Sequence, residues 1–172
     1  MFHHLSTVHQ HRKIVRQCCF KCGLYYQGLT HDLSKYSLSE LKPSIRYFQG
    51  DRSPYSKEKE LYGYSQGWLH HKGRNKHHWE YRYDMMNKAY SPVKMPEKYV
   101  AESVCDRVAA CRTYQKEEYT CRSALEYFES KNDGKHMHPE TAALMERFLR
   151  MIAEDGEDAA FHEIREYLKQ SK

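Results

Sequence analysis

The sequence lacks any apolar run that approaches the ~18–20 residues needed to span a bilayer. Its beginning, Met-Phe-His-His-Leu-Ser, also lacks the apolar stretch of a secretory signal peptide, so we expect a cytoplasmic protein. No internal repeat or low-complexity tract is present. Apolar residues make up 40% of the 172 residues, below the usual ~45–50%. A chain of this length still buries roughly 70% of its surface on folding, which is enough for one domain.

A complete zinc-binding cysteine set is also missing. Among the six cysteines, Cys19 and Cys22 have CxxC spacing, but no second CxxC or downstream histidine pair completes a structural zinc site. The pair lies within a helical pattern. We therefore expect buried free thiols, with structural zinc as the alternative.

Charge is unevenly distributed along the chain. The net charge is +5, but residues 1–100 hold 17 Lys and Arg against 8 Asp and Glu, whereas residues 101–172 hold 11 against 15. A basic half that is also rich in histidine suits an anionic substrate or a nucleic-acid surface. An ordinary solvated surface is the alternative interpretation.

Apolar residues recur at helical spacing from Leu5 to about Tyr26 and predict a first helix there. His11 shares the stripe of Val15 and Cys18, because the three residues follow one another at i, i+4 and i+7. His11 is therefore either a hydrogen-bonded core histidine or a metal ligand.

The most informative stretch follows, with the adjacent pair His31-Asp32 and a lysine at position 35. We expect the pair on, or at the end of, a short second helix that starts near Thr30. Imidazole beside carboxylate suits a divalent ion such as Mn, Fe, Ni, Zn or Mg. Lys35, one turn further on, suits a substrate phosphate.

Ser37 and Glu40 have the spacing of a capping box and predict a helix from Leu38 to about Phe48. Residues 49–64 carry Gly, Pro and Ser without sustained apolar periodicity, so we expect a long loop. In such a loop Arg52 would help to cover a bound anion, unless the segment is a disordered surface loop.

Two histidine pairs follow seven residues apart, His70-His71 and His77-His78. If the segment is one helix, the pairs lie two turns, or about 10 Å, apart and suit two ions. If Gly73 breaks it into a turn, the pairs come together. A basic solvated helix is the remaining alternative.

Beyond a Pro-rich connector, residues 99–111 read as a buried helix in which Asp106 lies beside an apolar stripe. A carboxylate in that position needs an ion pair or a metal. Three further helices are expected over about 123–130, 139–153 and the C-terminal residues. These three helices carry no cluster of possible metal ligands. We expect His136, His138 and His162 to face solvent.

These patterns predict an all-α single domain of about six to eight helices, with a metal-site core over about residues 8–115 and scaffold helices over about 120–170. The polar residues on inward faces follow the order His, His-Asp, His pairs, Asp. This order and the string His31-Asp-Leu-Ser-Lys35 resemble the HD superfamily of metal-dependent phosphohydrolases. The chain is also similar to a bacterial and phage family of short uncharacterised proteins within it, through the segments around His31, His71 and Cys105-Asp106-Arg107.

The resemblance implies an HD-like helical bundle that holds one or two divalent ions. It implies His11, His31, Asp32, His71, His78 and Asp106 as ligands, with His70 and His77 as second choices. It further implies hydrolysis of a phosphomonoester, nucleotide or related phosphodiester by metal-activated water. Asp32, Lys35 and Arg107 would serve catalysis, and Lys35, Arg52 and Arg74 would bind the phosphate.

Two other readings stay open. One is a metal- and nucleotide-binding sensor without turnover. The other is a nucleic-acid-binding protein that uses Lys72, Arg74 and Lys76, which we consider the weaker of the two. The expected partner is a small phosphorylated substrate.

Overall fold

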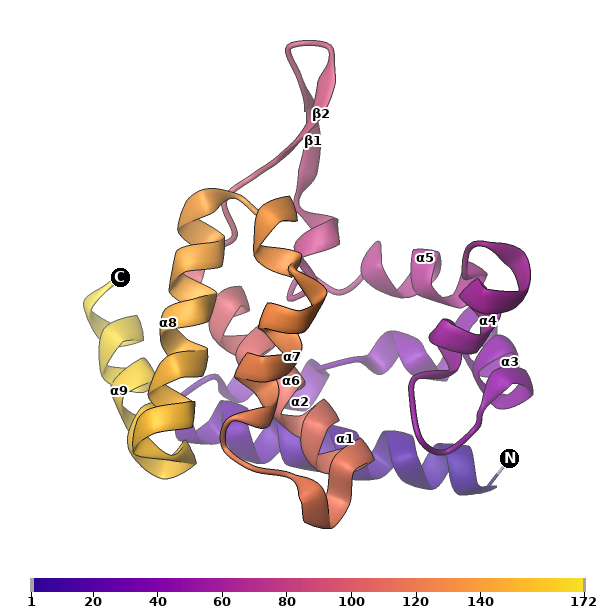
Figure 1. The fold of residues 1–172 in the computed structure, drawn as a ribbon, viewed down its shortest axis with the longest axis horizontal. Coiled ribbons are helices and arrows are strands. Elements are labelled where there is room, and N and C mark those ends of the chain that lie inside the picture. Colours follow the sequence, from indigo (N-terminus) through magenta and orange to yellow (C-terminus); the bar gives the residue numbers. More distant parts are fainter. Residues whose placement is uncertain (1, 172) are drawn as a thin grey trace.

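The computed structural model describes residues 2–171, with side chains from residue 4 onward. Figure 1 shows a helical body from which one hairpin projects. Within the described part there are nine α-helices, which confirms the all-α prediction and slightly exceeds the expected number. They are α1 (Phe2–Lys21), α2 (Tyr25–Thr30), α3 (Leu38–Tyr47), α4 (Pro54–Tyr62), α5 (Gln66–Lys72), α6 (Glu97–Gln115), α7 (Ser123–Lys131), α8 (Pro139–Asp155) and α9 (Glu157–Gln170).

Short elements connect these helices. Four 3₁₀ turns lie at Leu33–Tyr36 (η1), Trp79–Tyr81 (η2), Lys116–Glu118 (η3) and Asp133–His136 (η4). Strands β1 (Tyr83–Met86) and β2 (Ala89–Pro92) pair antiparallel. Among the described residues, no helix is both long and apolar enough to cross a membrane.

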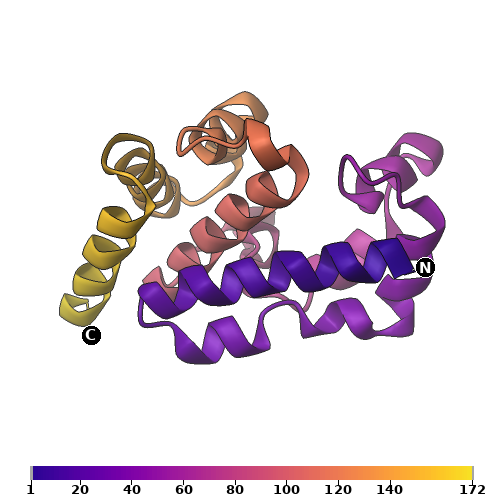
Figure 2. The same cartoon turned by 90° about the horizontal axis from the view of Figure 1, so that it is seen from below.

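The main core lies where α6 packs between α1 and α8, while α9 closes the far side of α8. In Figure 2, α1 runs along the length of the molecule and α6 crosses it. Val15 of α1, Val104 of α6 and Phe148 of α8 are fully buried. The expected C-terminal helices are present as α7, α8 and α9 and supply much of this core.

The expected single helix from Leu5 to Tyr26 is in fact two helices. Gly23 has a φ of +75°, a conformation that glycine adopts at little cost, and the chain turns there. α2 then packs back against α1. The turn brings the end of α2 beside the middle of α1, where His11 lies.

The expected loop over residues 49–64 is wrong, because Pro54–Tyr62 forms α4. Pro54 occupies the first turn, where its missing N–H costs nothing. The inward face of α4 is built from Tyr55 and Glu58, both buried. Because this face carries a phenol and a carboxylate in place of aliphatic side chains, apolar periodicity does not reveal the helix.

The hairpin β1–β2 was not predicted from the sequence. Its strands are mostly exposed, and Asn87 and Lys88 form its two-residue turn with φ values of 51° and 65°. Such left-handed turns match strand twist but usually contain glycine. Without a glycine or a buried face, the segment gives no clear strand signal.

The close packing of α5 on α3 and α4 generates a prediction at Gly67. A Cβ at this position would lie 2.8 Å from Tyr55 Cε1 and 3.2 Å from Pro43 Cγ. The Tyr55 ring is held by its hydroxyl, which donates to Glu40. Gly67→Ala should therefore lower the free energy of unfolding by about 1–3 kcal/mol in chemical denaturation.

Gly134→Ala is the matched control, since its Cβ would meet Phe128 at an ordinary 3.4 Å. The control should be neutral or slightly stabilising. Equal stability of the two variants would contradict the close packing at Gly67.

Candidate metal centre

His31 and Asp32 lie at the junction between α2 and η1. The His31 N–H donates to the Gln27 carbonyl and ends α2. Asp32 has a φ of +53° and a ψ of 28°, the left-handed conformation that aspartate tolerates better than most side chains. This confirms the expected place of the pair at a helix end and turns both side chains toward the same buried space.

A first group of possible ligands joins α1, the His31-Asp32 junction and α6. Its members are His11, His31, Asp32 and Asp106, each offering one ligand atom within 4.8 Å of the others. His11 Nε2 lies 2.9 Å from Asp106 Oδ1, and His31 Nε2 lies 3.4 Å from both Asp32 Oδ2 and Asp106 Oδ1. These donors have the type and spacing of a divalent metal site.

A second group shares Asp32 and adds His71, His77 and His78. His71 Nε2 and His77 Nε2 lie 3.4 and 3.5 Å from Asp32 Oδ1. α5 ends at Lys72 with Gly73 as its C-cap, so the turn that follows brings both pairs to one place. The interpretation of one continuous helix is wrong, because Gly73 breaks it.

The groups also show which of the paired histidines lie close enough to the others to share an ion. His71 and His78, the first choices, belong to the second group, and so does His77, a second choice. His70 belongs to no such group among the described residues, and its Nδ1 instead contacts Glu40 Oε1 at 2.7 Å. Sequence spacing could not decide this, because the outcome depends on the path of the turn after Gly73.

Glu102 orients two of the histidines. Its Oε1 lies 3.0 Å from His31 Nδ1 and 3.1 Å from His77 Nδ1. An imidazole that donates its Nδ1–H to a carboxylate presents the Nε2 lone pair on the other side, as metal-bound histidines commonly do. These two contacts give Glu102 a role in positioning both imidazoles.

Glu40 plays the equivalent part for the second group, which the sequence did not reveal. It has 0% exposure, and its Oε2 lies 2.7 Å from His71 Nδ1. The capping interpretation is wrong, because Ser37 makes no side-chain cap at the start of α3. Ser37-x-x-Glu40 has the capping spacing, but Glu40 turns inward to the histidines.

Several polar atoms at the centre have no hydrogen-bond partner within the described part of the chain. Buried donors and acceptors in proteins are nearly always paired, and each exception calls for an explanation. Five such atoms belong to residues of the two ligand groups. They are His11 Nε2, His31 Nε2, Asp32 Oδ1, His77 Nε2 and His78 Nε2.

The charges at the centre are unbalanced. Asp32, Asp106, Glu40 and Glu102 bring four carboxylates. Against them stand the Lys35 ammonium, 2.7 Å from Asp32 Oδ2, and the His31 imidazole, whose pKa the neighbouring carboxylates raise. Buried carboxylates are costly unless cations compensate them. The surplus of negative charge is one that a divalent ion would offset.

Burial and neighbouring charges set the protonation of the histidines. Burial alone would lower the pKa of His31, but Asp32 and two further carboxylates raise it well above its usual value. Burial and the neighbouring His77 hold the pKa of His78 well below its usual value, so this imidazole is neutral. A neutral imidazole is the form that binds metal.

Of the cations assigned to phosphate or catalysis, Lys35 alone is at the centre among the described residues. Burial lowers the pKa of its ammonium, but Asp32 reverses this and raises the pKa above its usual value. Arg107 is instead paired with Asp133 at 2.8 Å, and Arg52 is paired with Glu60 at the surface. The structure therefore does not bring these two guanidinium groups to the centre, and their roles in phosphate binding and catalysis stay predictions.

Arg74 does not reach the centre either. It is exposed, and its Nη1 lies 3.5 Å from the His70 carbonyl. It lines a separate cavity whose lining includes neither Lys35 nor Asp32. The structure therefore does not place Arg74 beside Lys35 or Asp32, and its assignment to the substrate phosphate stays a prediction.

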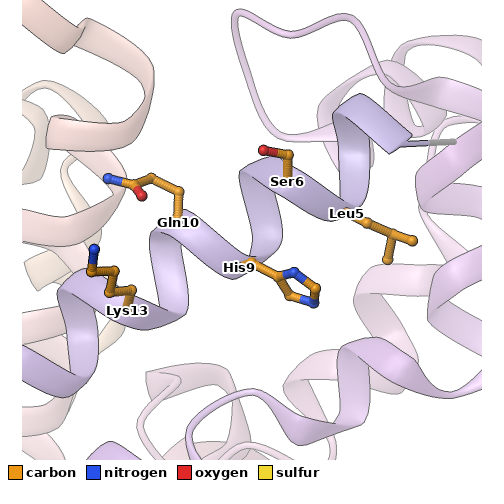
Figure 3. Close-up of a pocket in the computed structure, with 5 residues that line it drawn as sticks. All are labelled: Leu5, Ser6, His9, Gln10 and Lys13. Carbon is orange, nitrogen blue, oxygen red and sulfur yellow. The ribbon is translucent and has the colours of Figure 1, made fainter.

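The remaining histidines lie away from the centre. His9 is exposed and lines an open hollow on α1 together with Leu5, Ser6, Gln10 and Lys13 (Figure 3). His136 and His162 are exposed, as expected. His138 is half-buried, and its ring accepts a hydrogen bond from the Glu140 N–H at the start of α8.

The cysteines are free thiols, five of them buried. Cys22 Sγ and Cys105 Sγ lie 3.9 Å apart across the α1–α6 contact. No metal-binding group within residues 2–171 includes a cysteine. Their packing agrees with the expected buried thiols.

The contacts of Glu40 generate a pH prediction. Burial alone would raise the pKa of Glu40, but hydrogen bonds from His71 and His70 lower it to about 2. The ionised carboxylate therefore stabilises the fold above pH 4.5, and this contribution is lost as the pH falls from 4.5 toward 2. The difference in unfolding free energy between the wild type and Glu40→Gln should shrink over this window by an amount on the order of 3 kcal/mol.

Denaturant titrations at several pH values measure this difference. Glu163→Gln, at an exposed position, is the control and should differ little from the wild type throughout. A difference between wild type and Glu40→Gln that stays constant from pH 4.5 to 2 would contradict the role of Glu40.

Comparison with known proteins gives a family but no function. The model of a family of unknown function (DUF5662) matches residues 1–151, which include every member of both ligand groups. No curated protein and no solved structure matches the chain. The match covers far more than half of the sequence, and the chain therefore belongs to this family of unknown function, DUF5662.

Proposed function

We propose that the protein is a metal-dependent phosphohydrolase of the HD type, acting on a phosphomonoester, nucleotide or related phosphodiester. One observation carries the proposal: two groups of buried histidines share Asp32, and Lys35 lies against that same carboxylate. Ligand groups that share a carboxylate suit two neighbouring ions, and such pairs of ions support in-line displacement at phosphorus.

The residues present fit one or two divalent ions. His11, His31 and Asp106 would hold the first together with Asp32. His71, His77 and His78 would hold the second, also with Asp32. The unpaired Nε2 atoms and the surplus of carboxylates support this assignment. Mn, Fe, Ni, Zn and Mg all suit mixed imidazole and carboxylate donors.

A bound divalent ion supplies Lewis acidity to a phosphoryl oxygen and lowers the pKa of a water toward ~7. The protein's own residues prepare the place for this chemistry. Glu102 and Glu40 hold His31, His77 and His71 by Nδ1. The three imidazoles are therefore already oriented to bind a metal ion.

Lys35 is the residue we assign to the substrate. The Lys35 side chain is 21% exposed, whereas that of Asp32 beside it is 1% exposed, so Lys35 lies between the buried carboxylate and solvent. A cation in this place can bind a phosphate oxygen and stabilise the charge that develops on it during transfer. Asp106, whose side chain is 17% exposed, and the half-buried His78 are also reached by solvent.

We also propose a cytoplasmic location and a small phosphorylated partner. Six free cysteines are typical of a reducing compartment. The basic turn at residues 73–78 is short and flanks the centre, which favours a small anion over a nucleic acid.

Asp32→Asn is the decisive test. Asparagine tolerates the left-handed backbone and keeps the shape of the side chain, so the change removes the shared charge with little strain. We expect loss of bound metal, measured by elemental analysis of protein purified without a metal-affinity tag. We also expect loss of hydrolysis across a panel of phosphomonoesters, nucleotides and phosphodiesters.

Asp84→Asn is the matched control, because Asp84 is an exposed hairpin residue. It should keep metal content and hydrolysis at the wild-type level. Hydrolysis retained by folded Asp32→Asn would refute the proposal. Stoichiometric metal with no hydrolysis of any phosphate ester by the wild type would favour the sensing module instead.

Lys35→Gln separates metal binding from catalysis. Lys35 belongs to neither ligand group, so metal content should be kept, while kcat falls by about 10²–10³ because charge stabilisation is lost. Lys42→Gln, at an exposed position of α3, should leave kcat unchanged. Parallel steady-state kinetics and elemental analysis check this; an unchanged kcat in Lys35→Gln would exclude the assigned role.

A further inference from the structure

A second cavity lies beside the metal centre, on its Nδ1 side. It measures about 290 Å³ and is bounded by α2, η1, the turn after α5, and the first half of α6. His31, His77 and Glu102 form part of its lining, whereas Lys35, Asp32 and Asp106 do not. A ligand in this cavity would therefore lie against Glu102, His31 and His77 rather than against Lys35 or Asp106.

The rim of the cavity is cationic. Arg74 and Lys76 both line it, and neither forms an ion pair with a residue in the described part of the chain. Two cations without an acidic partner among the described residues favour an anion at this rim.

The interior of the cavity offers hydrogen bonds. Gln27 and Thr30 line it from α2, and Ser34 and Asn75 from the opposite side. Glu102 uses Oε1 for both histidines, and no bond to its Oε2 is found among the described residues. That second oxygen is an acceptor, and a ligand hydroxyl is the donor that suits it.

We propose that this cavity, which adjoins the metal centre through His31, His77 and Glu102, binds a small hydroxylated phosphate such as a sugar phosphate. Arg74 and Lys76 bind the phosphate, and Glu102 accepts from a hydroxyl. The volume is near the lower end for ligand pockets, ~300 Å³, which fits a ligand of this size. The inference does not rest on the proposed hydrolysis. Arg74 and Lys76, which bind the phosphate, lie outside both ligand groups, and Glu102 serves that reaction only by positioning histidines.

Ribose 5-phosphate, ribose and inorganic phosphate are the probes, added to the metal-loaded full chain. Titration calorimetry gives affinities, and amide NMR shifts locate the site. We expect ribose 5-phosphate to bind more tightly than either fragment and to shift the amides of Thr30 and Lys76. Arg74→Gln/Lys76→Gln should weaken its binding at least about tenfold, as the loss of two charge-assisted contacts requires.

The control is Lys42→Gln/Arg46→Gln, which removes the same charge from the exposed face of α3 and should change affinity less than about twofold. Gln27→Trp, which fills the cavity, should also abolish binding. Equal affinity for inorganic phosphate and ribose 5-phosphate would overturn recognition of the hydroxyls. Amide shifts centred on Lys35 and Asp106, together with unchanged affinity in Arg74→Gln/Lys76→Gln, would show that ribose 5-phosphate does not bind in this cavity.

Discussion

The constraint on which the site depends is the burial of more carboxylates than the protein can neutralise. Asp32, Glu40 and Glu102 are almost wholly buried, and Asp106 is nearly so. One ammonium and a set of imidazoles surround them. An arrangement of this kind is unfavourable as packing alone, because hydrophobic groups of the same volume would cost less. Its presence in the middle of an all-α fold therefore points to binding of a cation.

The parts of this centre that could be predicted are those with a local signature. His11 shares a stripe with buried apolar residues, His31-Asp32 is an unusual pair beside helix punctuation, and Asp106 interrupts a buried helix. Each signal depends on neighbours within a few turns, and the structure brings these residues together. Most of the fold was predictable for the same reason, since α6, α8 and α9 have clear apolar faces.

The parts that could not be predicted depend on distant contacts. The partners of Arg52 and Arg107 lie 8 and 26 residues away, and no local pattern indicates them. Glu40 has the spacing of a helix cap, and its inward orientation follows from the packing of α3 against α5. The choice among paired histidines depends on the path of one turn. Polar inward faces, as on α4, give no apolar period at all.

α6 contributes both to the hydrophobic core and to the candidate metal centre. Val104 and Val108 pack into the core, while Glu102 and Asp106, four residues apart on the same helix, meet the histidines. Two carboxylates at this spacing repel each other on an isolated helix. Imidazoles from α1 and from the turn after α5 contact the two carboxylates and offset this repulsion.

The ligands of the first group are spread from position 11 to position 106. During synthesis the chain grows from its N-terminus at about 5–20 residues per second, and the second group is complete once His78 has emerged. Asp106 follows later, on the helix that also forms the core. An ion captured early would thus meet the second group first. The first group could bind an ion only after α6 has packed against α1. Occupancy of both groups would therefore indicate that α6 has folded into place.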